Sequence, residues 1–371
     1  MIHFRPYKSL LLLVLLVTVK GTLLAQNLFN ENFNLAVEAI QQKQYKKAIS
    51  LFDQAIKHKD LASNDYKVAR AYIGKSNAYL YLGKPKEAIA EIDKGIQIKP
   101  EFGDLYSAKA GCYVAQKQYK AAINALRIGR KLKPESIEIL AFMADCAYKD
   151  KQYKNGSAIC DTILQFNPMF TRGISLKGAF LSRLKDYKGA DVYFTKAISI
   201  DPTKVIPYYD RGISRAYDGQ LDLAYEDMNK AMNMDTTDLK WVGYNNIAFF
   251  IYLKREQYQA AIDYFNIAMK YLKDKSISAP LNNRGYAKFK LGDIEGGLKD
   301  INDALKMEPS SSFAYRNLAL IYFHQGKSEK ACQSLMKAKE LDFTIDYGDE
   351  VDELIQKQGC ANNGVSSEKK Q

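Results

Sequence analysis

Apolar and polar residues alternate along most of the chain with the period of an amphipathic helix. Segments such as KQYKAAINALRIGRKLKP and KDYKGADVYFTKAISIDP place apolar residues three or four positions apart, with charged residues between them. Short polar turns separate neighbouring segments, and a proline ends many of them. Because proline lacks the amide hydrogen that an interior helical residue donates, this pattern predicts short helices that are joined in pairs.

The helix pairs recur at a constant spacing. Pro100, Pro134, Pro168 and Pro202 are each 34 residues apart, and Pro309 closes the similar segment LGDIEGGLKDINDALKMEP. This pattern resembles the tetratricopeptide repeat, a helix pair with small side chains at positions 8, 20 and 27. Such side chains allow paired helices to approach closely.

The small residues can be followed through nine aligned units. Position 8 is Ala36, Ser76, Ala110, Ala144, Gly178, Gly212, Ala248, Gly285 and Ala319. Position 20 is Ala48, Ala88, Ala122, Gly156, Ala190, Ala224, Ala261, Gly297 and Ala331. Position 27 is alanine or glycine except at Ile163, so we expect repeat four to pack more openly.

The resemblance implies an all-α fold. We expect residues 29–343 to form a right-handed α-solenoid superhelix of about nine helix-turn-helix repeats. Residues 344–358, which are rich in acids at their start, are expected to form a C-terminal capping helix, and residues 359–371 a disordered tail.

Four segments depart from the period. About six extra residues lie near HKDLASNDY, and five more are distributed over DTTDLKW, LKREQY and LKDKSISAP in repeats six to eight. Extra residues in repeat proteins usually form loops or helix ends, and we expect them there. They are either neutral insertions or places where the superhelix bends or contacts a partner.

The amino terminus differs from the repeats. Arg5 and Lys8 precede an apolar run over residues 10–19, and Ala25 precedes a candidate cleavage point. Because the run is too short to span a bilayer as a helix, residues 1–25 are predicted to be a secretory signal peptide. The mature chain would then have no transmembrane segment, and it would be exported to the periplasm, the cell envelope or the extracellular space.

The charge is positive but dispersed. Lys and Arg number 54 against 42 Asp and Glu, a net charge of +12, which becomes +9 if Arg5, Lys8 and Lys20 are removed with the leader. Acids and bases alternate along the chain without a block of like charges. Since nucleic-acid binding normally needs a basic stripe, we expect no nucleic-acid partner.

Candidate catalytic groups are few. Beyond the leader the histidines are His58 and His324, and neither has Cys or His at metal-ligand spacing. The carboxylates are expected mostly on solvated helix faces. Residues 69–76, ARAYIGKS, resemble a phosphate-binding loop but lie inside a predicted helix, where the backbone amides are already bonded. We therefore predict no catalytic residues, no metal and no cofactor, and a protein that is not an enzyme.

The five cysteines fall into two groups. Cys112, Cys146 and Cys160 are at positions expected to face the core, where thiols behave as small apolar groups. Cys332 and Cys360 would meet if the terminal helix folded back on repeat nine. They then form a disulfide, and otherwise they are free thiols.

The resemblance also implies a binding surface. In this family the first helices of successive repeats line a concave groove, and some relatives bind a peptide backbone with asparagines at position 6. The last three repeats carry Asn246, Asn283 and Asn317 there. The other candidate groove residues are Asp210, Asn245, Asn282, Tyr286, Phe289, Arg316 and Phe323. Asparagine at position 6 either contacts a peptide or serves helix packing alone.

These features favour a non-catalytic protein–protein interaction scaffold that binds a peptide or partner protein in the concave groove. We expect Arg316 to pair with an acid of that partner. The alternative is a structural or assembly component of a cell-envelope or secretion complex that uses the convex face.

Overall fold

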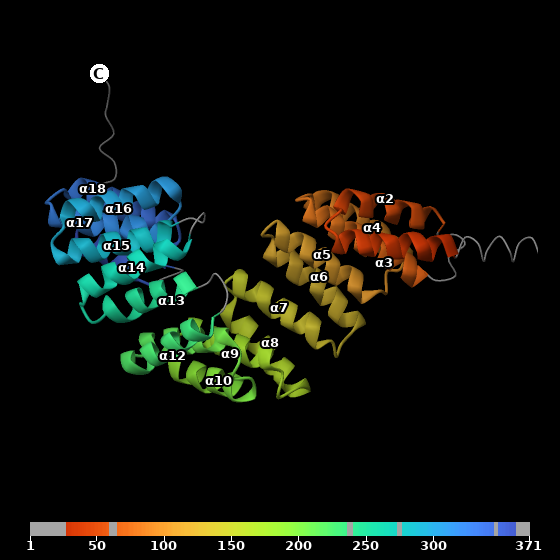
Figure 1. The fold of residues 1–371 in the computed structure, drawn as a ribbon, viewed down its shortest axis with the longest axis horizontal. Coiled ribbons are helices and arrows are strands. Elements are labelled where there is room, and N and C mark those ends of the chain that lie inside the picture. Colours follow the sequence, from red (N-terminus) through yellow and green to blue (C-terminus); the bar gives the residue numbers. More distant parts are fainter. Residues whose placement is uncertain (1–26, 59–64, 236–239, 273–276, 345–347, 361–371) are drawn as a thin grey trace, which may run out of the picture. The chain divides into compact units, whose positions relative to one another are not determined.

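The computed structural model describes residues 27–58, 65–235, 240–272, 277–344 and 348–360. In these ranges every regular element is a helix, as the sequence pattern predicted. The chain divides into two compact units, Met1–Lys185 and Asp186–Gln371. Figure 1 colours their helices in chain order. The predicted signal peptide, 1–25, and residues 361–371 of the predicted tail lie outside the described residues.

Unit 1 is a stack of helices in sequence order. Residues 27–41 are helical, and each following helix packs against the one before it. The following helices are α2 (Tyr45–Lys57), α3 (Asp65–Tyr81), α4 (Pro85–Ile98), α5 (Gly103–Ala115), α6 (Tyr119–Leu132), α7 (Ile137–Lys149), α8 (Tyr153–Phe166) and α9 (Thr171–Arg183).

Unit 2 continues the same alternation and ends with an additional helix. Its elements are α10 (Tyr187–Ile200), α11 (Val205–Tyr217), α12 (Leu221–Met234), α13 (Lys240–Ile247), the π-helical turn η2 (Ala248–Tyr252), α14 (Tyr258–Leu272), α15 (Ser278–Leu291), α16 (Ile294–Met307), α17 (Ser312–His324), α18 (Ser328–Glu340) and α20 (Glu350–Lys357). The division between the units falls between α9 and α10, which are the two helices of the predicted fifth repeat.

The turn inside each repeat contains one residue with left-handed backbone. These residues are Lys43, Gly83, Lys117, Lys151, Lys185, Gly219, Glu256, Gly292 and Gly326. This conformation ends the first helix and reverses the chain direction. Glycine adopts it freely, whereas a lysine or glutamate pays about 1–2 kcal/mol.

The small residues of the repeat lie where paired helices touch. Every alanine at positions 8 and 20 is fully buried. In repeat eight both positions are glycine, and a Cβ on Gly285 or Gly297 would lie 2.9 or 2.8 Å from the carbonyl oxygen of the other. Since real Cβ atoms do not approach an oxygen so closely, α15 and α16 can cross at this distance only with glycine at both positions.

Repeat four does not pack more openly, so that expectation was wrong. Ile163 is fully buried, and Gly173 on α9 leaves room for it, because a Cβ on Gly173 would lie 2.7 Å from Ile163 Cγ2. Gly156, also in repeat four, is covered by the Phe180 ring of α9, and a Cβ on Gly156 would lie 2.1 Å from that ring. Large residues in this region are thus matched by glycines on the facing helix, which keeps the core closely packed.

Repeat seven accommodates an extra residue in η2. Ala248 and Ala261, at positions 8 and 20, are 13 residues apart, whereas the corresponding residues of the other repeats are 12 apart. A π-helical turn takes up one inserted residue within a helix. The LKREQY insertion therefore falls at the end of a first helix, as expected. The other three insertions lie partly outside the described residues.

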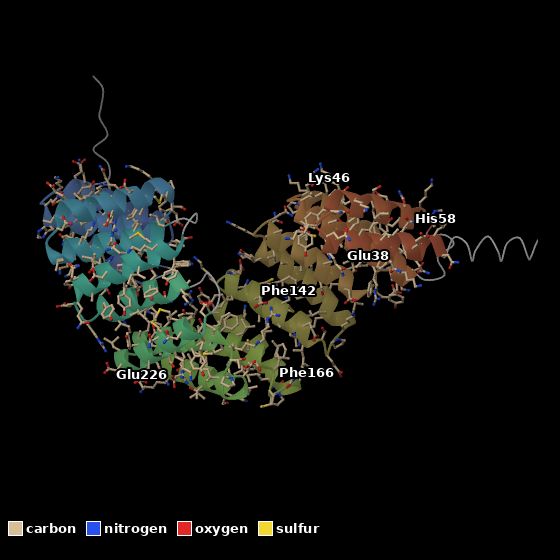
Figure 2. The ribbon with its side chains drawn as sticks, in the orientation of Figure 1. Glu38, Lys46, His58, Phe142, Phe166 and Glu226 are labelled. Atoms are coloured by element: carbon tan, nitrogen blue, oxygen red, sulfur yellow. A yellow bond between two sulfur atoms is a disulfide. The ribbon has the colours of Figure 1, made fainter. Side chains whose placement is uncertain are left out.

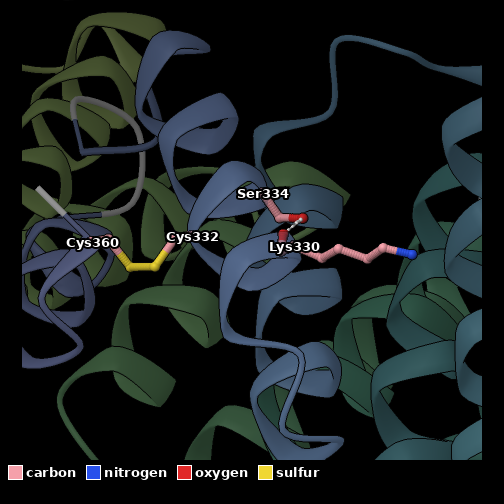
Figure 3. Close-up of a disulfide and its surroundings, with 4 residues drawn as sticks. All are labelled: Lys330, Cys332, Ser334 and Cys360. Atoms are coloured by element: carbon pink, nitrogen blue, oxygen red, sulfur yellow. Dashed lines mark hydrogen bonds between the residues drawn. A yellow bond between two sulfur atoms is a disulfide. The ribbon is translucent and has the colours of Figure 1, made fainter. Parts of the chain in front are cut away.

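The terminal helix packs on the last repeat. Val351 and Ile355 of α20 are buried in a cluster with Leu335 of α18. A disulfide joins Cys332 of α18 to Cys360 (Figure 3). Cys360 is 4% exposed. This corrects the expected start of the disordered tail at residue 359, because the bond holds Cys360 against the repeat.

We expect Gly156→Ala to lower the free energy of unfolding by about 1–2 kcal/mol, because the new methyl must displace the buried Phe180 ring. Gly111 in α5 is the matched control, since nothing lies within 4 Å of a Cβ added there. Gly111→Ala should stabilise the protein by up to about 1 kcal/mol through helix propensity. Urea denaturation followed by circular dichroism measures both changes. Equal stabilisation by the two substitutions would show that Phe180 does not restrict Gly156.

Candidate functional site

The arginine and the asparagines among the predicted groove residues of repeats seven to nine form one run of hydrogen bonds, which we call the amide chain. In order, its members are Arg316, Asn317, Asn282, Asn283, Asn245 and Asn246. They lie on α17, α15 and α13, the first helices of three successive repeats (Figure 1). Each member donates to the next, so all donors point from Arg316 towards Asn246.

The hydrogen bonds within the amide chain connect neighbouring repeats. Asn317 Nδ2 donates to Asn282 Oδ1 (3.1 Å) between α17 and α15. Asn283 Nδ2 donates to Asn245 Oδ1 (3.4 Å) between α15 and α13. The amide chain can cross both helix interfaces because each carboxamide accepts and donates at the same time.

Burial separates the amide chain into an inner and an outer part. Asn317, Asn282 and Asn283 are 0%, 4% and 9% exposed, whereas Asn245 and Asn246 keep exposed surface. The amides of Asn282, Asn283 and Asn317 are buried and bonded within the fold, which favours the packing alternative for these three residues. Among the described residues nothing accepts a hydrogen bond from Asn246 Nδ2, so the outer end retains a donor.

The acid that pairs with Arg316 comes from this chain. Arg316 Nη2 bonds to Glu350 of α20, and Nη1 donates to Asn317 Oδ1 (2.8 Å). The guanidinium lies 5.4 Å from the ring centroid of Tyr286 and 5.7 Å from that of Phe313, within reach of cation–π attraction. Its side chain is 12% exposed. This corrects the expectation that Arg316 binds an acid of a partner.

The aromatic candidates are partly used in packing. Phe323 contacts the cluster that includes Cys332 and Phe343, and Phe289 packs against the cluster around Ile301. Tyr286 lies beside Phe289 on α15, with ring centroids 6.4 Å apart. Both rings, and Asp210 on α11, are partly exposed. The structure therefore gives Phe323 and Phe289 packing roles that the groove prediction did not include.

Sequence reasoning missed a set of buried ion pairs. Arg211 bonds to Asp227 through two nitrogens (2.6 and 2.8 Å), and Arg284 bonds to Asp300 in the same way (2.7 and 2.8 Å). Both carboxylates are 4% exposed, although we expected carboxylates on solvated faces. In each pair the acid follows the cation by 16 residues, from the first helix of a repeat to the second. This spacing in the sequence could have revealed the pairs.

The lysine of the phosphate-loop-like segment belongs to the same kind of network. Lys75 lies inside α3, 7% exposed, and its Nζ contacts Glu91 (3.1 Å) and Asp53 (2.6 Å). Burial lowers the pKa of Lys75, but hydrogen bonds to Asp53 and Glu91 outweigh it, so the pKa is raised overall. The charge of Lys75 is thus neutralised by two carboxylates within the fold.

In the part of the chain that the structure describes, no three His, Cys, Asp or Glu side chains cluster in a way that could hold a metal ion. None of the described helices combines the length and apolar character that crossing a bilayer requires.

The three free cysteines are buried. Cys112, Cys146 and Cys160 are between 0% and 2% exposed. Burial raises the pKa of Cys146 and of Cys160 to about 12, and it also raises the pKa of Cys112. Because the thiolate is the nucleophile, these thiols are unreactive at neutral pH.

Sequence comparisons point to one family. Models described as tetratricopeptide repeat match residues 69–102, 173–204 and 301–333. The chain is 26% identical over 186 residues to a TPR repeat-containing protein of Methanocaldococcus jannaschii, covering 49% of this chain and 33% of that protein. It is 28% identical over 160 residues to tetratricopeptide repeat protein 6 of Homo sapiens, covering 43% and 30%. The chain thus spans about a third of the length of these curated relatives.

Solved structures share the helical arrangement. A tetratricopeptide repeat protein from Parabacteroides merdae is similar with a TM-score of 0.58 and 13% identity, over 69% of this chain and 98% of that chain. A chain of the APC/C hetero-tetramer Cut9–Hcn1 has a TM-score of 0.53 and 12% identity, over 88% and 75%. This chain is an α-solenoid of tetratricopeptide repeats. Solenoids of this kind present extended surfaces formed by successive repeats.

We expect Asp227→Asn to destabilise the TPR solenoid by about 3–5 kcal/mol, because Arg211 and Arg215, whose side chains are 13% and 14% exposed, lose the buried carboxylate that they share. Asp303, which pairs with Lys306 at the surface, is the control. Asp303→Asn should leave the urea denaturation curve unchanged. A loss below about 1 kcal/mol for Asp227→Asn would contradict a stabilising role for the buried pair.

Thiol titration should distinguish the two groups of cysteines in the TPR solenoid. Ellman's reagent should label none of Cys112, Cys146 and Cys160 in the native protein near neutral pH, since all three are buried thiols. In guanidinium it should label three thiols, and after reduction five. Five thiols in guanidinium without reductant would show that Cys332 and Cys360 are not bonded.

Proposed function

We propose that this TPR solenoid is a scaffold without a catalytic role, and that unit 2 binds an extended segment of a partner protein. The binding surface would be the first-helix face of unit 2, defined here by Asp210, Asn245, Asn246 and Tyr286, which all keep exposed surface. The observation that carries the proposal is the amide chain, which ends in an unused donor at Asn246.

The buried members of the amide chain would orient the exposed ones. Asn283 holds the Asn245 carboxamide through its oxygen, and Asn245 in turn holds that of Asn246. A donor that is already fixed loses little conformational entropy when a ligand binds, which favours affinity. Because Arg316 donates at the inner end, each amide is polarised in the direction that strengthens donation from Asn246. The ligand group this favours is a hydrogen-bond acceptor such as a main-chain carbonyl.

We also propose that the scaffold acts outside the cytoplasm, after removal of residues 1–25. The basic start and the apolar run of the leader support export. The Cys332–Cys360 disulfide is in keeping with an oxidising compartment. Export would also permit the scaffold to act within a cell-envelope or secretion complex. Amino-terminal sequencing of the mature protein tests this proposal, and an intact Met1 would contradict cleavage.

Selection from a peptide library tests the proposed surface. Random peptides of about 12 residues would be selected on the wild-type protein, and their affinities measured by fluorescence anisotropy. The doubly substituted protein Asn245→Ala/Asn246→Ala should bind the selected peptides roughly tenfold or more weakly, a loss of about 1.4 kcal/mol or more.

The matched control lies at the same repeat position in unit 1. Asn34 is at position 6 of repeat one and is exposed, so Asn34→Ala should leave the affinity within about twofold. Circular dichroism would verify that both proteins are folded. Peptides that bind Asn245→Ala/Asn246→Ala and wild type equally would overturn the proposed surface.

A further inference from the structure

A hollow lies on unit 1, on elements that the proposed binding face does not include. It has a volume of about 740 Å³ and is formed by α6, α7 and α8. We call it the α6–α8 hollow. Its apolar lining includes Met143 of α7, which is 5% exposed, and the partly exposed Ile159 of α8. Phe166, at the end of α8, also lines it and is 49% exposed (Figure 2).

Three cations line the α6–α8 hollow, and no acid does. Arg127, Arg130 and Lys131 are on α6. Arg127 donates to Asn124 Oδ1 (3.1 Å), and within the described residues none of the three forms an ion pair. Arg130 and Lys131 lie in the last turn of α6, where the helix dipole favours cations. Arg127 lies a turn earlier, so the dipole does not account for its position. The hollow therefore combines an apolar lining with an uncompensated positive wall.

A second hollow, in unit 2, lacks this combination. The hollow on α15 and α16 in unit 2 is also lined by cations, among them Arg284 and Lys288. Both of those bond to the buried Asp300, so a carboxylate in the same hollow offsets part of their charge. In unit 1, Lys109 pairs with Asp93 and Lys177 with Asp161. Arg127, Arg130 and Lys131 lack such a carboxylate partner among the described residues and share one wall of the α6–α8 hollow.

We propose that the α6–α8 hollow binds an acidic amphipathic helix of a partner protein. The apolar stripe of that helix would contact Met143, Ile159 and Phe166, and carboxylates along one edge of the stripe would pair with Arg127, Arg130 and Lys131. A half-exposed aromatic ring beside a recessed apolar surface is the usual form of an interface anchor. A helix suits the site better than a strand because α6, α7 and α8 offer no open sheet edge, whereas side chains on helix surfaces form grooves that accept the ridge of another helix.

An anionic membrane is the other surface that attracts cations beside apolar groups. Membrane-bound faces insert protruding apolar side chains into the lipid. Here Met143 is buried and lines a hollow, so it does not protrude into lipid. The side chains along one ridge of a partner helix could enter the hollow and contact it. The recessed lining therefore favours the helix.

The test uses a defined probe. A fluorescein-labelled peptide of about 18 residues would carry leucine and phenylalanine at helical spacing, with glutamates along one edge. Its binding would be followed by anisotropy at about 50 mM and about 500 mM salt. We expect the peptide to bind the full chain with an affinity that falls roughly tenfold at the higher salt. The variant R127E/R130E/K131E should bind it roughly tenfold or more weakly than the wild type does. Phe166→Ala should weaken binding at both salt concentrations, because its contribution is apolar.

Controls separate the site from net charge and from the surface on unit 2. K46E/K47E/K57E on α2 makes the same change in charge and should keep the affinity within about twofold (Lys46, Figure 2). Asn245→Ala/Asn246→Ala should also leave it unchanged, so this proposal and the proposed function can fail separately. If the triple reversal unfolds, Lys131→Glu and Phe166→Ala singly replace it.

Three results would overturn the proposal. One is equal binding of a peptide with the same composition in scrambled order, which lacks the stripe. Another is unchanged affinity for R127E/R130E/K131E. The third is that the folded wild type binds phosphatidylglycerol vesicles through these three cations but does not bind the peptide. The occupant of the hollow would then be a membrane.

Discussion

The close approach of paired helices is the interaction on which the rest of this structure depends. It requires small side chains at positions 8 and 20 of each repeat, and the alanines at these positions are fully buried. Where both are glycine, at Gly285 and Gly297, the backbones come within a distance that excludes even a methyl group. Between successive repeats, the first helices α13, α15 and α17 place their asparagines within hydrogen-bonding distance of one another. The amide chain is formed at this second kind of contact, between repeats whose helix pairs are already closely packed.

The periodic features could be predicted from the sequence because they are local. A 34-residue spacing of prolines and small residues is enough to place the helices and the turns between them. The direction of a polar side chain was not predictable in the same way. Asn317 is on the groove side of its helix by position, yet it is fully buried, since Asn282 on the preceding first helix accepts its hydrogen bond. Such a partner is identified only when two repeats are seen together.

Where a residue departs from the repeat pattern, a residue elsewhere in the fold compensates for it. Such a change is not visible at the departing position alone. Ile163 implied a looser repeat, but Gly173 on the next helix makes room for it. The added residue of repeat seven is absorbed in η2, so the helices on either side keep their register. The division of the chain between α9 and α10 had no signal in the sequence, where the repeat continues through Lys185 without interruption. The buried acids Asp227 and Asp300 were missed because charge was judged by composition rather than by its spacing relative to the repeat.

The amide chain also bears on how this region unfolds. In a solenoid each repeat usually contacts only its neighbours, so the end repeats can fray one at a time. Here hydrogen bonds run without a break from Asn246 to Arg316, and Arg316 bonds to Glu350 on a helix that a disulfide ties to α18. Opening any one of these repeats would leave buried amides of the next without partners, which is costly. Repeats seven to nine and the terminal helix are thereby coupled into one cooperative block, with fraying opposed at the very end where a solenoid is ordinarily weakest.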